Sequence, residues 1–308
     1  AHRLAVRTPP FHGGDTGSSP VGRTSLVSHV QPLPSPSIAF RTTLSACCRL
    51  NPKRISVQVP VYAINLERSK DRWEALRESA ARFGIELRRV EAVDGSTLDQ
   101  ADLAGLDEPG FRRIHGKRVL PAEIGCYFSH LRALETIAAA PEPYAVLVED
   151  DIVFTPDFLP FLAGLTRLGG WDAVKLVNHR TPLIRHIHRV NSTHGIGRCL
   201  HGPLGSSAAY VVTREGAARL LAALRPMRLP YDVALERGWA GGYEIFTADK
   251  AVVGLSEALI STIGGSAAYA RTRLPPWKRL GTLRFRAGDY VRRIGYALRG
   301  TKIEEVRS

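Results

Sequence analysis

Tyr144-Ala-Val-Leu-Val-Glu-Asp-Asp151 is a short apolar run that ends in three consecutive carboxylates. Its aromatic and β-branched residues follow Pro141-Glu-Pro143, so residues 144–148 are predicted to form a strand that is buried on both faces. Three acids at the carboxyl end of such a strand would repel one another and lose solvation. A divalent cation removes both problems, whereas a solvated acidic turn needs no ligand. The stretch therefore predicts either a metal site or an ordinary turn.

The formal charge of +13 is concentrated at the two ends of the 308-residue chain. Residues 1–54 carry seven Lys/Arg and one Asp, and residues 271–308 carry eleven Lys/Arg against three acids. Residues 55–270 hold 24 bases and 25 acids, which leaves them almost neutral. The basic character therefore belongs to the termini and gives no argument that the folded body binds nucleic acid.

Cysteine usage and hydropathy favour a cytoplasmic protein. The four cysteines (Cys47, Cys48, Cys126 and Cys199) lack metal-ligand spacing, and the adjacent pair lies in a segment that folds poorly, so no disulfide framework is expected. No apolar run approaches the roughly 18 residues that span a bilayer. The first residues also lack the apolar core of a signal peptide.

Residues 1–54 are rich in Pro, Gly, Ser and Thr, and we expect them to be disordered. Two origins are open. Codons that can encode Gly17-Ser-Ser-Pro20 resemble the T-arm of a transfer RNA gene, so the segment is either read-through of an upstream RNA gene or a genuine disordered arm. In the first case the true start lies near residues 51–57. Peptide mapping of natively expressed protein distinguishes the two.

Residues 55–270 are predicted to form one domain of alternating strands and helices. Strands are expected at 57–64, 87–93, 144–148, 173–177 and 207–213, and helices at 69–83, 121–140 and 214–224. Pro60 suggests an edge or irregular position for the first strand. A long loop with short helices is expected at 96–119, and a loop-rich stretch with many His and Arg residues at 178–204. This order predicts an α/β fold with a Rossmann-type sheet and helices on both faces.

In such sheets ligands bind beyond the carboxyl ends of the strands, where Asn65 and the acidic triplet both fall. Arg68 follows the first strand and Arg72 lies in the first turn of the next helix, so both can reach a phosphate or a base. The alternative is a solvated helix face on which Arg72 pairs with a nearby Glu.

The predicted helix from Pro121 carries Glu123 and His130 seven residues apart, which places them on one face. Gly125 costs about 1 kcal/mol against Ala inside a helix, so a close approach of backbone or ligand would explain it. Ser129 and His130 could contact a sugar or phosphate. A structural histidine is an equally good interpretation.

In the acidic triplet, alternation along the strand would point Glu149 and Asp151 to one side and Asp150 to the other. Hard oxygen ligands at a strand end suit Mg²⁺ or Mn²⁺, which bind few carboxylates together with substrate phosphates. That geometry suits a metal that bridges a diphosphate and neutralises a nucleotide leaving group.

Several motifs occur here in the order of a known family. They are Ala63-Ile-Asn-Leu-Glu-Arg-Ser-Lys-Asp-Arg72, Val93-Asp-Gly95, Pro121-Ala-Glu-Ile-Gly-Cys126 with Ser129-His130, Leu147-Val-Glu-Asp-Asp151, Gly205-Ser-Ser-Ala-Ala-Tyr-Val-Val-Thr213, Leu229-Pro-Tyr-Asp232 and Ser261-Thr-Ile263. Together the motifs resemble glycosyltransferase family 25, the lipooligosaccharide galactosyltransferases and their relatives. The resemblance covers about residues 57–264.

The resemblance implies a GT-A-like fold, a UDP-sugar donor (UDP-galactose or UDP-glucose), a divalent metal, and inversion at the anomeric carbon. It also implies an acceptor in a bacterial surface glycan such as lipopolysaccharide. By this analogy Glu149, Asp150 and Asp151 take the place of the DxD metal motif, with Asp151 as the first candidate for a direct ligand. The residues implied to lie against the donor are Asn65, Arg68, Arg72, Asp94, Glu123, Ser129 and His130.

An inverting transfer needs a general base for the acceptor hydroxyl. Asp232 is the first candidate and Glu236 is the second, although either could simply be a carboxylate near a helix start. Many GT-A enzymes supply a late His to the metal, but the last His here is His201. Asp232, Asp249 or water would have to replace it.

Residues 271–302 mix ten Lys/Arg with aromatic and aliphatic residues, which suits an interfacial element on anionic lipids at the inner membrane. A solvated tail that packs partly on the body is the alternative, and RNA binding would use the same charge.

The sequence therefore predicts a metal-assisted hexosyltransferase. The competing functions are a nucleotidyltransferase or phosphohydrolase with the same acidic metal site, and a non-catalytic glycan-binding relative.

Overall fold

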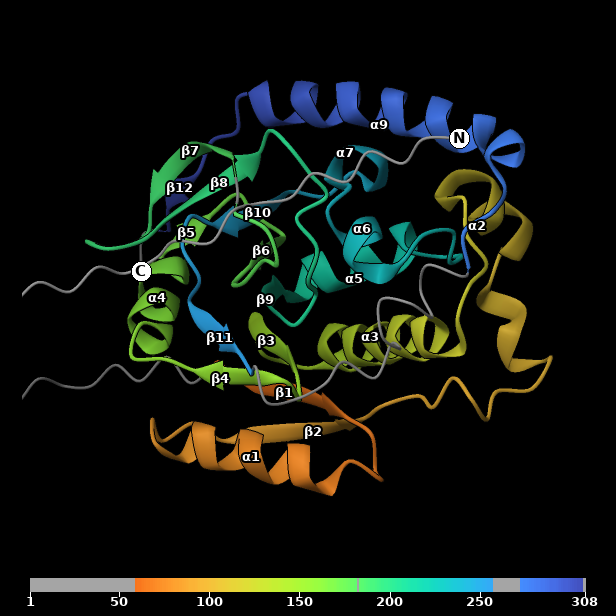
Figure 1. Ribbon diagram of the computed structural model, residues 1–308. Helices are drawn as coiled ribbons and strands as arrows, with labels where there is room; N and C mark the ends of the chain where they lie inside the picture. Colours follow the sequence, from red (N-terminus) through yellow and green to blue (C-terminus); the bar gives the residue numbers. More distant parts are fainter. Residues whose placement is uncertain (1–58, 182, 257–271, 307–308) are drawn as a thin grey trace, which may run out of the picture. The chain divides into compact units, whose positions relative to one another are not determined.

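The computed structural model describes residues 59–181, 183–256 and 272–306 (Figure 1). All of them belong to one compact unit, Ile55–Ser308. The predictions for residues 1–54 and for the motif Ser261-Thr-Ile263 lie outside the described residues.

An eight-stranded mixed sheet forms the centre of the described unit, in the order β2-β1-β3-β9-β6-β10-β8-β7. The strands are β1 (Val61–Asn65), β2 (Leu87–Glu91), β3 (Tyr144–Glu149), β6 (Ala173–Lys175), β7 (Ile184–Arg189), β8 (Gly195–Cys199), β9 (Ala209–Thr213) and β10 (Ile245–Ala248). Strand β1 runs parallel to β2 and β3, and β6 runs parallel to β10, whereas β9 is antiparallel to β3 and β6. The carboxyl ends of β1, β3, β6 and β10 therefore lie along one edge of the sheet.

Two smaller sheets pair strands that are distant in sequence. Strand β4 (Ile152–Phe154) pairs with β11 (Val253–Leu255), and β5 (Leu168–Gly169) pairs with β12 (Glu304–Glu305).

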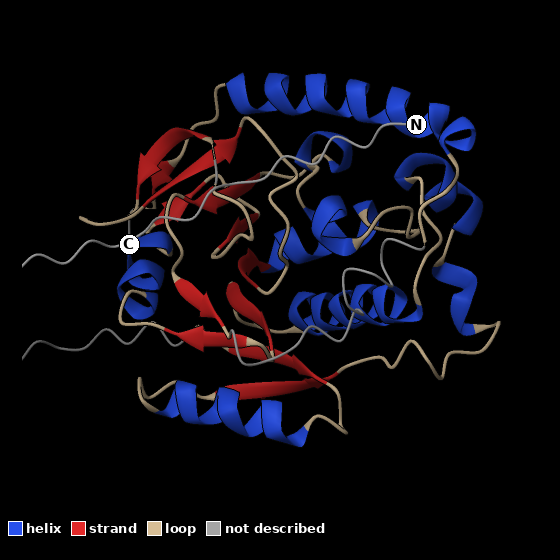
Figure 2. Cartoon of the chain, in the orientation of Figure 1, coloured by secondary structure: helices blue, strands red, loops and turns tan. Residues whose placement is uncertain are grey.

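Helices cover both faces of the large sheet, as Figure 2 shows. Because side chains alternate along a strand, Val61 and Ala63 join the core under α1 (Lys70–Ala81) and α4 (Phe158–Leu165). Tyr62 and Ile64 join the opposite core, under α3 (Pro121–Ala139), α5 (Arg214–Ala223) and α6 (Tyr231–Leu235). The predicted α/β architecture, with a sheet flanked by helices, is confirmed.

The remaining helices are short, with one exception at the carboxyl end. The short ones are η1 (Asp102–Gly105), α2 (Glu108–His115), α7 (Gly238–Gly241) and η2 (Pro276–Arg279). Helix α9 (Leu280–Leu298) is the long one, and it contacts α2, α7 and β8. No helix within the described ranges is both long and apolar enough to cross a membrane.

Two local features differ from the predictions. The first strand is not an edge strand, because β1 lies between β2 and β3. Pro60 is accommodated because it precedes β1, where its carbonyl accepts a hydrogen bond from Val146 N. The loop-rich stretch 178–204 also contains two antiparallel strands that were not predicted, β7 and β8. The half-exposed edge strand β7 carries Arg and His instead of the apolar alternation by which strands are recognised.

Gly125 is explained by a close approach of two backbone segments, as its position inside a helix predicted. A Cβ atom at this position would lie 2.6 Å from Val93 O and 2.7 Å from Gly95 N. Only glycine allows α3 to contact the loop after β2 in this way. The contact places the first half of α3 beside the carboxyl ends of β1 and β3.

Candidate active site

Asp150 forms an internal bridge at the carboxyl end of β3. Its Oδ2 accepts a hydrogen bond of 2.7 Å from Asn65 Nδ2, and its Oδ1 lies 2.6 Å from Arg72 Nη2. Asn65 also donates to Ser69 O at the start of α1. Burial raises the pKa of Asp150, while Asn65 and Arg72 oppose that rise. Asp150 therefore ties β1, β3 and α1 together, and both of its oxygens are occupied.

Asp151 is the member of the triplet with a buried oxygen that lacks a partner. Its Oδ1 is buried without a hydrogen-bond partner, and its Oδ2 lies 3.5 Å from Arg72 Nη2. Burial raises the pKa of Asp151 to about 7, with repulsion from Glu149 and Asp150 adding to the effect and Arg72 opposing it. A buried carboxylate oxygen without a partner, beside two other acids, is a position that fits a divalent cation.

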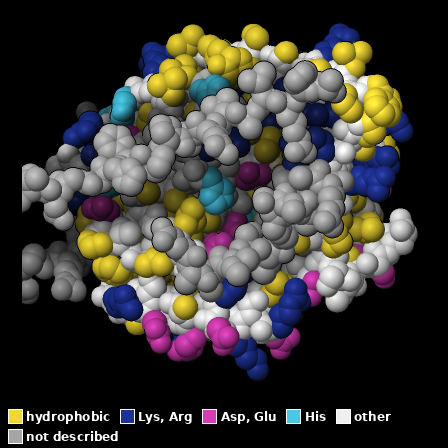
Figure 3. Space-filling view, viewed as in Figure 1, with side chains coloured by type: hydrophobic (Ala, Val, Ile, Leu, Met, Phe, Trp, Pro, Cys, Tyr) yellow, Lys and Arg dark blue, Asp and Glu magenta, His cyan; other side chains and the backbone are white. Residues whose placement is uncertain are grey.

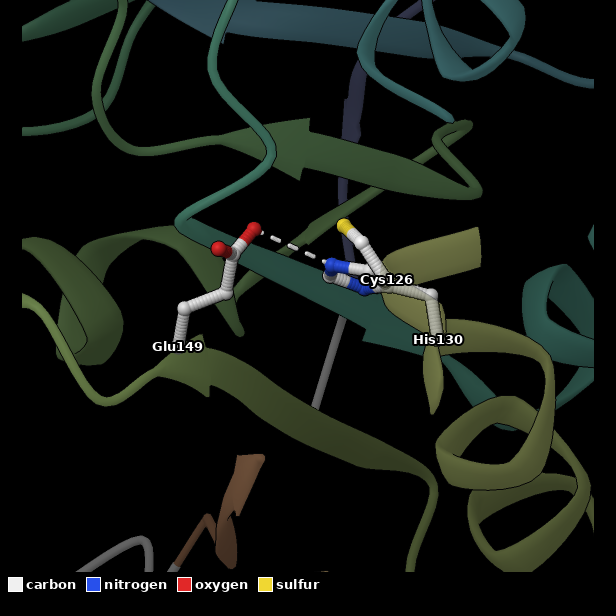
Figure 4. Close-up of side chains that lie close together, drawn as sticks. All are labelled: Cys126, His130 and Glu149. Atoms are coloured by element: carbon white, nitrogen blue, oxygen red, sulfur yellow. Dashed lines mark hydrogen bonds and ion pairs between the residues drawn. The ribbon is translucent and has the colours of Figure 1, made fainter. Parts of the chain in front are cut away.

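Glu149 joins β3 to α3 and to the segment before β9. Its Oε1 lies 3.1 Å from His130 Nε2 and accepts a hydrogen bond of 2.7 Å from Ser207 Oγ (Figure 4). Burial acts to raise the pKa of Glu149, but His130, Ser207 and Arg72 outweigh it and lower that pKa. Glu149 is therefore ionised at neutral pH and keeps a negative charge next to Asp151.

His130 is held by a buried aromatic network. Its Nδ1 lies 3.2 Å from the Tyr210 hydroxyl, which is 2.8 Å from the Tyr231 hydroxyl. The imidazole also stacks on the Tyr231 ring, with 4.0 Å between the ring centroids. These contacts match the structural interpretation of His130, which is buried, is bonded through both ring nitrogens and positions Glu149. Contact of His130 with a sugar or phosphate stays a prediction.

Cys126 completes a cluster that sequence reasoning missed. Its Sγ, a ring nitrogen of His130 and a carboxylate oxygen of Glu149 all lie within 4.8 Å of one another, and Figure 4 shows the three side chains directed toward a common point. The spacing of Cys126 and His130, four residues apart on one helix, was the available signal. Burial and the neighbouring acids raise the pKa of the thiol well above its usual value, so the cysteine side chain is neutral. A neutral thiol is a poor metal ligand, because the thiolate is the form that binds a metal.

Eight of the predicted site residues line one cavity of about 410 Å³. They are Asn65, Arg68, Arg72, Asp94, Ser129, His130, Glu149 and Asp150. Arg68 forms an ion pair with Asp94, which also accepts hydrogen bonds from the backbone and hydroxyl of Ser96. Arg72 Nε is buried without a hydrogen-bond partner. The alternative partner for Arg72, a nearby Glu on the helix face, is wrong, since Arg72 faces the acids of the triplet.

The side chains of Glu123 and Ser129 form hydrogen bonds with backbone groups. Glu123 Oε2 accepts a hydrogen bond of 2.8 Å from Leu120 N and so caps the start of α3. Ser129 Oγ donates to Gly125 O and accepts from Val93 N. Both side chains fix the position of α3 against the loop after β2.

The two candidate bases differ sharply. Glu236 is buried between Lys175 Nζ at 2.8 Å and Arg293 Nη1 at 2.9 Å, and it accepts from the backbone of Leu204 and Gly205. Burial acts to raise the pKa of Glu236, but the two cations outweigh it and lower that pKa. A carboxylate with this many donors is a structural anion and a poor proton acceptor.

Asp232 lines a second cavity, of about 770 Å³. Burial and repulsion from Glu236 raise the pKa of Asp232, and Lys175 opposes this. Asp249 takes no part in this arrangement, because its Oδ1 accepts a hydrogen bond from Gly195 N.

One protein family matches this chain over residues 58–235: Glycosyltransferase family 25 (LPS biosynthesis protein). The chain belongs to glycosyltransferase family 25. A glycosyltransferase 25 family member of Anopheles gambiae is 29% identical over 169 residues, which are 52% of this chain and 28% of the mosquito protein. Human procollagen galactosyltransferase 2 is 33% identical over 102 residues, 32% of this chain and 16% of the human protein.

The human inactive glycosyltransferase 25 family member 3 is 29% identical over 184 residues, 56% of this chain and 30% of that protein. The chain thus spans less than a third of the length of each of these relatives. The family 25 match includes β1, α3 and β3, which contribute residues to the first cavity, and α6, which contributes Asp232 to the second. Residues 273–293 of the second cavity lie outside the matched region.

Proposed function

We propose that this protein is a hexosyltransferase that moves galactose or glucose from a UDP-sugar to a lipooligosaccharide or another surface glycan, with inversion and with the help of Mn²⁺ or Mg²⁺. The observation that carries the proposal is the cavity of about 410 Å³ in a family 25 chain. Eight of the predicted site residues line it, beside Asp151, which has a buried oxygen without a partner. The human relative named as a procollagen galactosyltransferase supports galactose as the sugar.

The donor nucleotide would occupy the cavity between α1 and α3. The volume of this cavity lies in the range of small-molecule binding sites. The start of α1 directs backbone N–H groups toward this side, and Arg68 and Arg72 supply positive charge. Asp94 follows β2 and lies where a ribose or base would be contacted.

Asp151 and Glu149 would hold the divalent cation, with Asp151 as the direct ligand. A bound cation would neutralise the negative charge that develops on the diphosphate leaving group. Arg72 and Asn65 occupy both oxygens of Asp150, so this residue orients the end of β3 and is not a ligand. His130 and Ser207 hold the Glu149 carboxylate in place.

Asp232 would take the proton from the acceptor hydroxyl. A raised pKa makes its ionised form a stronger base than an exposed Asp, and among the described residues no side chain donates a hydrogen bond to it. Glu236 is not the base we propose, because its oxygens are occupied by Lys175, Arg293 and backbone N–H groups.

Helix α9 would hold this cytoplasmic enzyme on an anionic membrane surface. Its buried residues are mainly polar and include Thr282, Asp289 and Arg293, whereas its outward face carries exposed apolar side chains. These are Leu280, Leu283, Tyr290, Val291 and Leu298, and they follow Trp277, which is 77% exposed. Figure 3 shows hydrophobic side chains gathered along α9.

An apolar stripe on an exposed helix, flanked by arginines such as Arg284 and Arg292, is the pattern of an interfacial helix on acidic lipids. This arrangement would bring the enzyme to a lipid-linked acceptor.

A non-catalytic role is the second candidate, because one human relative is named as an inactive family member. The nucleotidyltransferase or phosphohydrolase alternative would use the same Asp151 site without a sugar acceptor. The decisive experiment is a panel of nucleotide sugars with Mn²⁺, in which protection against thermal unfolding and slow donor hydrolysis are measured. We expect one UDP-hexose to give both signals. Absence of either signal with every donor would favour the non-catalytic role.

A further inference from the structure

The second cavity, of about 770 Å³, lies between α2, the loop 202–205, the start of α6 and the inner side of η2 and α9. Its walls are strongly basic. Six cationic side chains line it, namely Lys117, Arg180, Arg273, Arg279, Arg286 and Arg293, against the two carboxylates of Asp232 and Asp289.

The acids do not compensate this charge. Arg293 pairs with Glu236, which is outside the cavity lining, and Asp289 Oδ1 accepts a hydrogen bond of 2.9 Å from Arg237 Nε. Within the described ranges, no carboxylate is within ion-pair distance of the four other arginines that line the cavity. Arg180 comes from one segment of the chain, and the other three arginines come from residues 273–286, which are distant from it in sequence.

Two further observations describe the cations of this cavity. Arg279 Nε is buried and has no hydrogen-bond partner among the described residues. The pKa of Lys117 is lowered to about 8, first by burial and then by repulsion from Arg273, Arg286 and Arg279, although Glu123 opposes the change. Like charges gathered in a concave site raise the local positive potential and attract an anion, although Arg180, Arg273 and Arg286 are themselves exposed to solvent.

We propose that this cavity binds a phosphate group of the acceptor, close to the hydroxyl that receives the sugar. Several guanidinium groups that line one cavity, here from residue 180 and from residues 273–293, suit the tetrahedral oxygens of a phosphate. The assignment to the acceptor rests on the proposed function, because Asp232 lies on the wall of this cavity and the donor residues line the other one. The site would select acceptors that carry a phosphate near the reactive hydroxyl.

The test compares two double variants of one segment. Arg279→Gln with Arg286→Gln removes charge from the cavity, and Arg284→Gln with Arg292→Gln removes the same charge from α9 outside the cavity. Inorganic phosphate is titrated into each protein at constant ionic strength, and the thermal midpoint and the NMR shifts of cavity residues are followed. We expect saturable binding by the wild type and by the Arg284/Arg292 variant, and at least about tenfold weaker binding by the Arg279/Arg286 variant.

Three further probes separate the possible sources of the anion. UDP with Mn²⁺ should bind the Arg279/Arg286 variant as well as it binds the wild type. Loss of UDP binding would assign the cavity to the donor and overturn the proposal. Acetate should not compete with phosphate, since equal competition would show a general anion site. For a phosphorylated glycan acceptor, the KM of the Arg279/Arg286 variant should be higher than that of the wild type. For the dephosphorylated acceptor, the two proteins should have the same KM.

The phosphate titration does not depend on catalysis. If no donor binds but phosphate binding is lost only in the Arg279/Arg286 variant, the proposed function fails and the anion site stands. If phosphate binds the wild type non-saturably, or binds both double variants equally well, the anion site is wrong whatever the donor panel shows.

Discussion

Arg72 Nη2 lies 2.6 Å from Asp150 Oδ1, so the first helix of the domain neutralises the middle acid of the triplet. Asn65 binds the other oxygen of the same carboxylate. This pairing divides three consecutive acids into three roles. Asp150 is bridged, Glu149 is hydrogen-bonded to His130 and Ser207, and Asp151 retains a buried oxygen without a partner. The predictions below depend on that division.

Asp151→Asn should abolish metal-dependent transfer while the fold is retained. The amide keeps the shape of the side chain but removes the charge that would bind the cation, so we expect kcat/KM to fall by at least about a hundredfold. Glu78→Gln, which removes an exposed acid from the outer side of α1, is the matched control and should leave activity unchanged. Activity in Asp151→Asn comparable to that of the control would show that the metal is misplaced.

Asp151→Asn should also remove part of the pH dependence of the thermal stability of the metal-free protein. Asp151 has a folded-state pKa of about 7, above its value in an unfolded chain, so its contribution to stability is complete at low pH and is lost as pH rises toward 7. We expect metal-free Asp151→Asn to exceed the wild type in thermal midpoint at pH 8 by a few degrees, at about 2–4 °C per kcal/mol, and to match it near pH 4. A constant difference across this range would contradict the raised pKa.

Asp232 and Glu236 should respond differently to substitution. Asp232→Asn should lower kcat by about 10²–10⁴-fold with a normal thermal midpoint, because it removes the proposed general base from a cavity wall. Glu236→Ala should instead unfold at a lower temperature, since it leaves Lys175 and Arg293 buried without their carboxylate, a loss of about 3–5 kcal/mol in comparable pairs. Thermal unfolding and activity per folded molecule, measured together, separate the two. A Glu236→Ala variant that is stable but inactive would indicate that Glu236, and not Asp232, is the general base.

Two glycine-to-alanine substitutions should change the free energy of unfolding in opposite directions. Gly125→Ala would bring its Cβ within 2.6 Å of Val93 O, so we expect a loss of about 1–3 kcal/mol despite the better helix propensity of Ala. Gly288 lies in α9 with no atom within 4 Å of an added Cβ, and Gly288→Ala should stabilise by about 0.5–1 kcal/mol. Urea unfolding of both variants is the measurement. A neutral Gly125→Ala would show that the contact with the loop after β2 is loose.

The outward face of α9 can be tested without deleting the tail. Arg293 pairs with Glu236 and the Tyr296 hydroxyl accepts from Ile245 N, so removal of residues 272–308 would damage the core. Leu283→Gln with Val291→Gln should weaken binding to vesicles of acidic phospholipid at least about tenfold and leave transfer to a water-soluble acceptor intact. The control is Leu159→Gln with Leu183→Gln, two exposed apolar residues outside α9. Equal vesicle binding by both double variants would exclude α9 as the membrane contact.

The sequence by itself determined the local elements and the edge of the sheet that carries the site. Tyr144–Glu149 reads as a buried strand, Pro121 begins a helix, and the acids and Asn65 follow strands that end at the same edge. Gly125 was interpretable because a glycine inside a helix requires a specific close approach. These features depend on period, caps and backbone sterics, all of which act over a few residues.

Only the tertiary structure decided which charges cancel. Glu236 became a structural anion because Arg293, 57 residues later, contacts it, and no pattern along the chain predicts that contact. The antiparallel β9 brings Ser207 to Glu149, and α3 brings Cys126 and His130 to the same carboxylate. Whether an acid binds a cation, takes a proton or stabilises the fold depends on burial and on the neighbours supplied by distant segments, because these set its charge and its free oxygens.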